Sequence, residues 1–117
     1  MRASRRERDA ATTAYRFEID VEKLNLCDVR ILTDHGEVID YTVLYLTIID
    51  GRLIPVERFD AAHGYPHRDT LDWEGHVVEK HWMPLESLRA AVNHAILDVK
   101  TNYRQYFEEF LERRPNR

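Results

Sequence analysis

The side chains best suited to acid–base or metal chemistry lie close together, within residues 58–81. Four of the six histidines are in this segment, and the first two, His63 and His67, are only four positions apart. Gly64 and Pro66, which lie between them, are unfavourable inside a regular helix. We therefore predict an ordered loop at one edge or end of a sheet, where functional sites are often found.

Two neighbouring imidazoles suggest catalysis of phosphodiester cleavage. Imidazoles titrate near neutral pH, so His63 and His67 could take a proton from a 2′-hydroxyl and give one to the leaving oxygen. An arginine would stabilise the charge that develops on the phosphate, and carboxylates would orient the imidazoles. The segment offers Arg58 or Arg68 for the first role, and Asp60 and Asp69 for the second. This reasoning predicts a metal-independent ribonuclease.

Two other interpretations of the same residues stay open. His63, His67 and one carboxylate, Asp60 or Asp69, could hold a divalent metal such as zinc, manganese or nickel. The segment does not match a helical zinc protease, because no Glu follows His63 and a regular helix is excluded. A purely structural role, in which Asp60 caps the loop and Arg58 pairs with an acid, would produce the same pattern. No other cofactor is expected.

The length and composition limit what surrounds this segment. The chain has 117 residues, of which 44% are apolar, enough for one domain but not for two. Its single cysteine, Cys27, cannot form an intramolecular disulfide. No apolar run of about eighteen residues and no signal peptide is present. We therefore expect a cytoplasmic protein without a membrane-spanning segment.

The charge is distributed unevenly along the chain. The net charge is −4, but residues 1–9 carry +2 and residues 113–117 carry +3, which leaves −9 on residues 10–112. An acidic body repels a polyanion, so RNA binding would need a local basic patch. We expect a flexible basic arm at residues 1–13, one α+β domain at residues 14–112, and a basic tail after it.

Hydrophobic periodicity predicts strands before the histidine segment. Residues 15–22 alternate between apolar and charged side chains, as a half-buried strand does, and residues 26–33 form a second strand with Cys27 facing inward. Residues 38–49 are apolar on both faces, which favours a strand in the middle of the sheet. The Asp50–Gly51 pair that follows predicts a tight hairpin.

Two more strands are expected on either side of the predicted loop. The strand after the hairpin contains Pro55, which has no backbone N–H to donate, so it should lie near an edge or carry a bulge. A last strand is plausible over residues 75–82. With the first three strands, this predicts an antiparallel meander of about four to five strands.

A helical period follows Pro84. Apolar residues recur at spacings of three and four from Leu88 to Phe110, so one long helix should pack across one face of the sheet. Such a helix is longer than the strands of a small sheet, and Phe107 and Leu111 lie beside its main apolar stripe. We therefore predict a homodimer through the C-terminal helix.

The segment from Val56 to Asp69 resembles a known signature. It has the pattern Arg-aromatic-Asp-x-Ala-His-Gly-x-x-His-x-Asp, which places Arg58, Asp60, His63 and His67 at the signature positions, with Lys80 behind them. A family of small uncharacterised bacterial and archaeal proteins shares this pattern after an antiparallel sheet and before a long helix. The resemblance covers the chain from about residue 15 onward.

The chain is more distantly similar to TumE-type toxins of toxin–antitoxin pairs. That similarity implies a toxin with a helix-turn-helix antitoxin as partner and RNA as substrate. The acid–base reasoning and the resemblance together give the expected catalytic residues: Arg58, Asp60, His63, His67, Asp69 and Lys80. The alternative function is a non-catalytic, dimeric interaction module.

Overall fold

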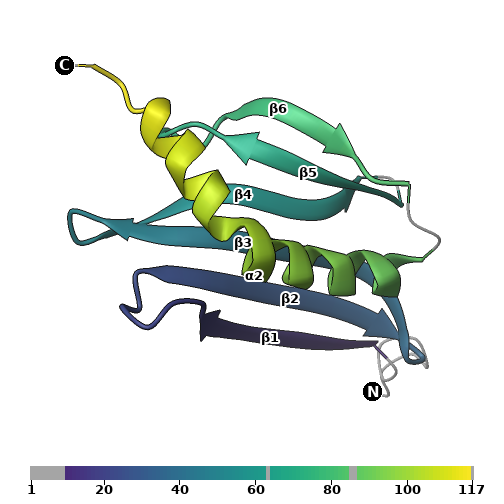
Figure 1. The fold of residues 1–117 in the computed structure, drawn as a ribbon. Coiled ribbons are helices and arrows are strands. Elements are labelled where there is room, and N and C mark those ends of the chain that lie inside the picture. The colour runs from purple at the N-terminus through teal and green to yellow at the C-terminus, as the bar shows by residue number, and fades with distance from the viewer. Residues whose placement is uncertain (1–9, 63, 85–86, 117) are drawn as a thin grey trace, which may run out of the picture.

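The computed structural model describes residues 10–62, 64–84 and 87–116. In these residues six strands form one antiparallel sheet in the order β1-β2-β3-β4-β5-β6, so each strand pairs with the next one in sequence (Figure 1). The elements are β1 Ala10–Glu18, β2 Asn25–Asp34, β3 Glu37–Ile49, β4 Arg52–Ala62, β5 Tyr65–Leu71, β6 Val77–Trp82 and α2 Leu88–Glu112. The α+β class and the meander are confirmed, with six strands in place of the four to five expected.

The core forms on one side of the central strands. Cys27 and Val29 of β2 are directly paired with Tyr45 and Val43 of β3, and all four side chains are fully buried. Paired residues of neighbouring strands share a face, so these side chains make one continuous apolar surface. The predicted core position of Cys27 and the central place of β3 are both confirmed.

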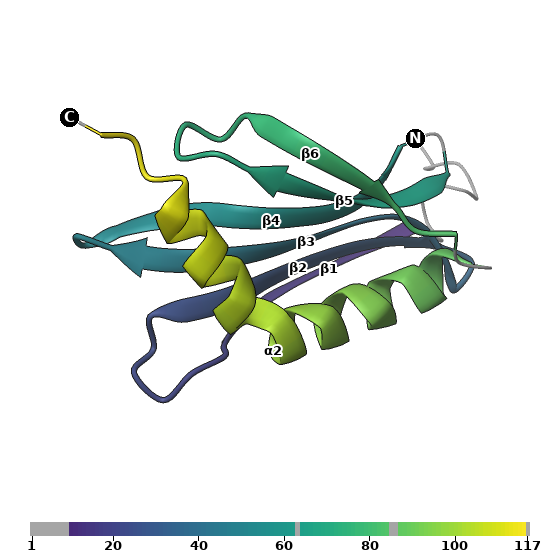
Figure 2. The same ribbon diagram turned by 45° about the horizontal axis from the view of Figure 1, so that its top comes forward.

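Helix α2 lies across this apolar surface (Figure 2). Ser87 caps its N-terminus, because the Ser87 side chain accepts a hydrogen bond from the backbone N–H of Ala90. The buried residues of the helix recur at helical spacing: Ala91, Val92, Ala95, Val99, Tyr106 and Phe110. The other side of the sheet, here called the far face, has no helix packed on it among the described residues.

The turns and the bulge follow the local sequence signals. Asp50 and Gly51 have φ values of 53° and 74°, as a two-residue hairpin with positive φ at both positions requires. Pro55 lies where the register between β3 and β4 shifts, opposite Leu46. The missing N–H of Pro55 is therefore accommodated at a bulge, as predicted, even though β4 is not an edge strand.

The prediction of a loop for the histidine segment is wrong. Arg58 and Asp60 belong to β4, whereas His67 and Asp69 belong to β5, and the two strands form a hairpin. Gly64 lies in the turn with a φ of 81°. The turn is so short that Pro66 already lies in the next strand, and the glycine and proline therefore mark a hairpin, not a longer loop.

The first strand begins and ends earlier than the alternation indicated. β1 starts at Ala10 and pairs with the end of β2, so residues 10–13 of the predicted arm are in the sheet. Residues 1–9 lie outside the described residues. Beyond Glu18 the chain turns, and Val21, one of the apolar residues of the predicted alternation, is almost fully exposed.

The C-terminal end of α2 is covered within the chain. The Phe110 ring is fully buried and stacks on Trp73 with the ring centroids 4.4 Å apart, and Trp73 Nε1 donates a hydrogen bond to the Phe110 carbonyl. Leu111 and Leu97 remain exposed on the outer side of the helix. These contacts within one chain do not test the predicted homodimer, which stays a prediction. The described helix is not apolar enough over its length to cross a membrane.

Candidate functional site

Five of the predicted site residues lie on the far face of the sheet, on three neighbouring strands. Arg58, Asp69 and Lys80 are directly paired across β4, β5 and β6, and Asp60 is directly paired with His67 in the adjacent row. Phe59, between Arg58 and Asp60, is buried in the core with α2. Because successive side chains of a strand point to opposite faces, the five face away from the helix. They are called the far-face cluster below.

The far-face cluster has a buried floor and a partly exposed rim. The His67 side chain is 3% exposed and that of Asp69 is 1% exposed. The side chains of Arg58, Asp60 and Lys80 are 35%, 29% and 41% exposed. A solvent molecule or substrate therefore meets the two cations and Asp60 first, with His67 and Asp69 beneath them.

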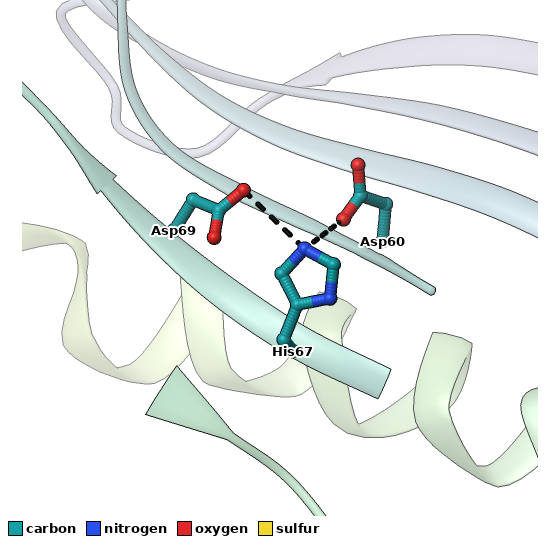
Figure 3. Close-up of side chains that lie close together, drawn as sticks. All are labelled: Asp60, His67 and Asp69. Atoms are coloured by element: carbon teal, nitrogen blue, oxygen red, sulfur yellow. Dashed lines mark ion pairs between the residues drawn. The ribbon is translucent and has the colours of Figure 1, made fainter. Parts of the chain in front are cut away.

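The imidazole of His67 lies between the two carboxylates (Figure 3). Its Nε2 atom is 2.5 Å from Asp60 Oδ1 and 3.3 Å from Asp69 Oδ2. Its Nδ1 atom lies 3.4 Å from the backbone carbonyl oxygen of Tyr65. One nitrogen thus faces both acids, and the other faces a backbone acceptor.

The two cations are arranged around the same carboxylates. Arg58 Nη2 donates a hydrogen bond of 2.8 Å to Asp69 Oδ2, and Arg58 Nε is 3.6 Å from Asp60 Oδ2. Lys80 Nζ lies 3.7 Å from Asp69 Oδ1 and 5.5 Å from the centre of the Trp82 ring. Trp82 also packs on the His67 ring, with the centroids 5.3 Å apart. The cluster therefore combines an imidazole, two acids, two cations and an aromatic wall.

Several polar atoms of the cluster are buried without a hydrogen bond. Among the described residues, four buried side-chain nitrogen or oxygen atoms have no hydrogen-bond partner, and Arg58 Nε, Asp60 Oδ1 and Asp69 Oδ1 are three of them. The polar neighbour of Asp60 Oδ1 is His67 Nε2, at 2.5 Å. Buried polar groups without a hydrogen bond are costly and few in folded proteins. Their concentration in this cluster indicates that the cluster lacks an interaction partner.

Burial also changes the acidity of the cluster. It raises the pKa of Asp60 above the usual value, while the neighbouring His67 and Arg58 act in the opposite direction. Burial disfavours a charged carboxylate, and nearby positive charge favours it.

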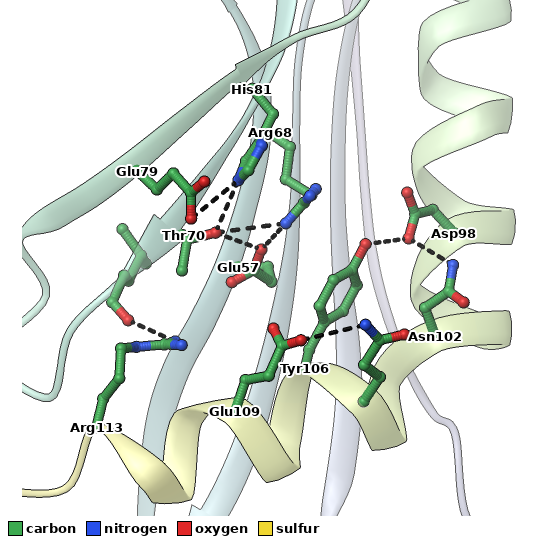
Figure 4. A network of polar contacts seen from close by, with 12 residues as sticks. Glu57, Arg68, Thr70, Glu79, His81, Asp98, Asn102, Tyr106, Glu109 and Arg113 are labelled. Carbon is green, nitrogen blue, oxygen red and sulfur yellow. Dashed lines mark hydrogen bonds and ion pairs between the residues drawn. The ribbon is translucent and has the colours of Figure 1, made fainter.

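A second polar cluster lies on the opposite face of the same strands, under α2 (Figure 4). This helix-face cluster consists of Glu57, Arg68, Thr70, His81 and Tyr106. Glu57 is buried and accepts hydrogen bonds from Arg68 Nη1 and from Thr70 Oγ1. The Arg68 guanidinium lies 4.9 Å from the centre of the Tyr106 ring. In the described residues, none of the side-chain atoms of the helix-face cluster is among the buried atoms without a hydrogen bond.

The structure therefore groups the predicted site residues selectively. Arg58, Asp60, His67, Asp69 and Lys80 come together, whereas His63 lies outside the described residues. Sequence reasoning did not place Trp82 or the Tyr65 carbonyl in the site, although both contact His67. A signal was available for the grouping itself, because Arg58-x-Asp60 and His67-x-Asp69 have the two-residue spacing of one strand face.

Part of the predicted metal donor set lies together in the structure. Within the described part of the chain, Asp60, His67 and Asp69 each offer one ligand atom, and all of these atoms lie within 4.8 Å of one another. His67 is thus close to both of the carboxylates that the sequence offered, and His63 lies outside the described residues. One imidazole and two carboxylates are a donor set that divalent cations accept.

Comparison with known proteins assigns the chain to a family but not to an activity. The family described as "Domain of unknown function (DUF7718)" matches residues 6–116, so the chain belongs to this family. No curated protein and no solved structure matches the chain.

Proposed function

We propose that this member of the family is a ribonuclease whose active site is the far-face cluster. The observation that carries the proposal is the convergence of Arg58, Lys80 and Asp60 at an accessible rim, with Asp60 against His67 and the two cations against Asp69. Phosphodiester cleavage needs cations for the phosphate and a base for the attacking oxygen, and both are present within one cluster.

The cations supply phosphate binding on an otherwise acidic body. Arg58 and Lys80 come from different strands and are both within 4 Å of Asp69, so they are held close to one carboxylate. A phosphodiester above Asp69 could contact both. Arg58 and Lys80 are thus the two cations that we propose for the phosphate, since RNA binding to an acidic chain needs local positive charge.

Asp60 is best placed to take the proton in this reaction. The 2′-oxygen attacks phosphorus, its proton passes to the Asp60 carboxylate, and the bond from phosphorus to the 5′-oxygen breaks. The 5′-oxygen takes a proton from solvent, which leaves a 2′,3′-cyclic phosphate and a 5′-hydroxyl. Asp60 is the carboxylate at the rim, whereas Asp69 is fully buried and already bonded to Arg58.

The biological setting that we propose is a toxin–antitoxin pair with a helix-turn-helix antitoxin. This part rests on the similarity to TumE-type toxins and on the signature positions Arg58, Asp60 and His67, which lie together on the far face. Expression of the wild type in a bacterial host should slow growth and degrade cellular RNA. Co-expression of an antitoxin encoded beside it should restore growth.

The direct test is cleavage of a labelled single-stranded RNA by the purified protein, with Mn²⁺ and separately with EDTA. We expect a cyclic phosphate product in at least one condition, and no cleavage of the same strand made with deoxyribose. Asp60→Asn should lower the rate about 100-fold. Glu79→Gln, a change of an exposed acid on the helix-facing side of β6, should leave the rate unchanged.

Absence of cleavage by the folded wild type in both conditions would overturn the ribonuclease proposal. The alternative of a dimeric interaction module would then gain weight. It is favoured by exposed Leu97 and Leu111 on the outer side of α2. Measurement of the molar mass in solution for the wild type and for Leu97→Glu tests that alternative directly.

A further inference from the structure

We propose that Asp60, His67 and Asp69 bind one divalent cation of the Mn²⁺ type. The site is defined by geometry alone, and the part that the cation plays in RNA cleavage rests on the function proposed above. The ligand atoms would be Asp60 Oδ1, His67 Nε2 and Asp69 Oδ2, which come from two paired strands. Three protein ligands leave further positions for water and for substrate.

The distances are close to those of a metal centre. Ligand atoms at right angles around a cation, with bonds of about 2.1 Å, are about 3.0 Å apart. His67 Nε2 and Asp69 Oδ2 are 3.3 Å apart, and His67 Nε2 and Asp60 Oδ1 are 2.5 Å apart. The first pair fits. Asp60 must move outward by about half an ångström, and its side chain is at the rim, where such a movement is allowed.

The second nitrogen of His67 is held as it is in many metal sites. A histidine ligand usually donates its other N–H to a carboxylate or a backbone carbonyl, which fixes the tautomer. The carbonyl oxygen of Tyr65 can only accept, and it lies 3.4 Å from His67 Nδ1. A proton on Nδ1 leaves the Nε2 lone pair directed at Asp60 and Asp69, as binding to a cation requires.

An independent observation points to a missing partner. Asp69 is 1% exposed, yet its Oδ1 has no hydrogen bond, whereas Asp60 Oδ1 lies 2.5 Å from His67 Nε2. Lys80 Nζ, at 3.7 Å from Asp69 Oδ1, is too distant to donate a hydrogen bond to it. A cation bound at Asp69 Oδ2 that also contacts Oδ1, as a bidentate carboxylate allows, would supply the interaction that this buried oxygen lacks.

The charges of the cluster also suit a divalent cation and a phosphodiester together. With a neutral imidazole, the formal charges of Arg58, Lys80, Asp60 and Asp69 cancel. A divalent cation makes the cluster positive, which favours an anionic phosphate. The choice of Mn²⁺ over Mg²⁺ follows from the ligands, because imidazole is a poor partner for Mg²⁺.

The competing arrangement has no metal. In it His67 is a doubly protonated imidazolium between the two acids, and Nε2–H is shared by Asp60 and Asp69. That state needs the same three side chains, so mutation alone does not separate the two arrangements. Direct measurement of cation binding does.

The test is titration of Mn²⁺ into the EDTA-treated, full-length protein, with the free ion followed by its electron paramagnetic resonance signal. We expect one equivalent to bind, and we expect Zn²⁺ to displace it while an equal concentration of Mg²⁺ does not. Asp60→Asn and Asp69→Asn should each weaken binding by more than about tenfold. Glu79→Gln, the exposed control, should bind as the wild type does.

Asp69 is buried, so Asp69→Asn could fail to fold. In that case Asp60→Asn, at the partly exposed rim, is the variant that tests cation binding. Absence of Mn²⁺ binding by the folded wild type overturns the proposal. So does binding that Asp60→Asn leaves unchanged. RNA cleavage in EDTA together with absence of binding would reject the metal and keep the ribonuclease, whereas binding without cleavage would keep the metal and reject the ribonuclease.

Discussion

The two polar clusters of β4, β5 and β6 lie back to back and differ in how their charges are satisfied. In the helix-face cluster, buried Glu57 is hydrogen-bonded to Arg68 and Thr70, and α2 covers it. In the far-face cluster, fully buried Asp69 keeps one oxygen without a hydrogen bond, and partly exposed Asp60 lies against His67. A satisfied cluster under a helix maintains the fold, whereas an unsatisfied one on an uncovered face is available to a ligand.

The comparison also explains why residue type alone does not identify the site. Arg58 and Arg68 belong to the same β4–β5 hairpin, and each forms an ion pair with an acidic residue. They differ by the face of the sheet on which they lie. The four predictions below test whether stability depends on one face and chemistry on the other.

The largest expected effect is on stability, from Arg68→Met. The methionine keeps an unbranched apolar side chain but removes the guanidinium, which lies over the Tyr106 ring and pairs with buried Glu57. Loss of one partner of a buried ion pair should lower the free energy of unfolding by about 3 kcal/mol. Chemical denaturation measures this value. The exposed Arg52→Met on β4 is the control, and equal stability of both variants would contradict the structural role of the helix-face cluster.

The matched change on the far face is Lys80→Met. Lys80 is 41% exposed, so its weak pairing with Asp69 contributes less than about 1 kcal/mol to stability. Loss of its charge next to the phosphate should nevertheless lower RNA cleavage about 100-fold. The rate and the free energy of unfolding are measured on the same preparation, with Lys100→Met on the helix as control. A loss of stability as large as that of Arg68→Met would remove the distinction between the faces.

The pH dependence of stability should depend on the helix-face cluster. Burial raises the pKa of Glu57 above its usual value, and Arg68 opposes this rise. Where the folded state holds a proton that the unfolded state has lost, the free energy of unfolding falls as pH rises. In Arg68→Met the pKa of Glu57 should rise further, so the pH range in which only the folded state holds the proton extends upward. The difference in the free energy of unfolding between the wild type and Arg68→Met should therefore grow between about pH 5 and pH 7, by at most about 1.4 kcal/mol per pH unit. A deficit independent of pH, in denaturation curves across that range, would show that Glu57 is not the group involved.

The smallest expected effect is the coupling between the two faces. Arg68 and Lys80 share no partner among the contacts of the described residues. The double variant Arg68→Met, Lys80→Met should therefore lose the sum of the two single losses of unfolding free energy, to within about 0.5 kcal/mol. A larger coupling in this double-mutant cycle would mean that the clusters act as one network through the strands.

The sequence by itself determined the features that depend on neighbouring residues. Asp50–Gly51 specifies its hairpin because both positions take positive φ, and the apolar residues 38–49 specify a central strand. The helical spacing from Leu88 onward specifies α2. For the site, the residue types of 58–81 identified Arg58, Asp60, His63, His67 and Asp69 as candidates, and the resemblance to the signature added Lys80, but neither identified Trp82.

The tertiary structure decided which of these residues meet and what they face. Gly64 and Pro66 do not distinguish a loop from a tight hairpin, because both residues break helices and occur in turns. Contact of Asp69 with Arg58 and Lys80 depends on the registers of two strand pairs. A shift of one residue would turn Asp69 toward the helix and Arg68 toward the far face. Register is fixed by the whole sheet and its packing against α2, and so it is not encoded in any single segment.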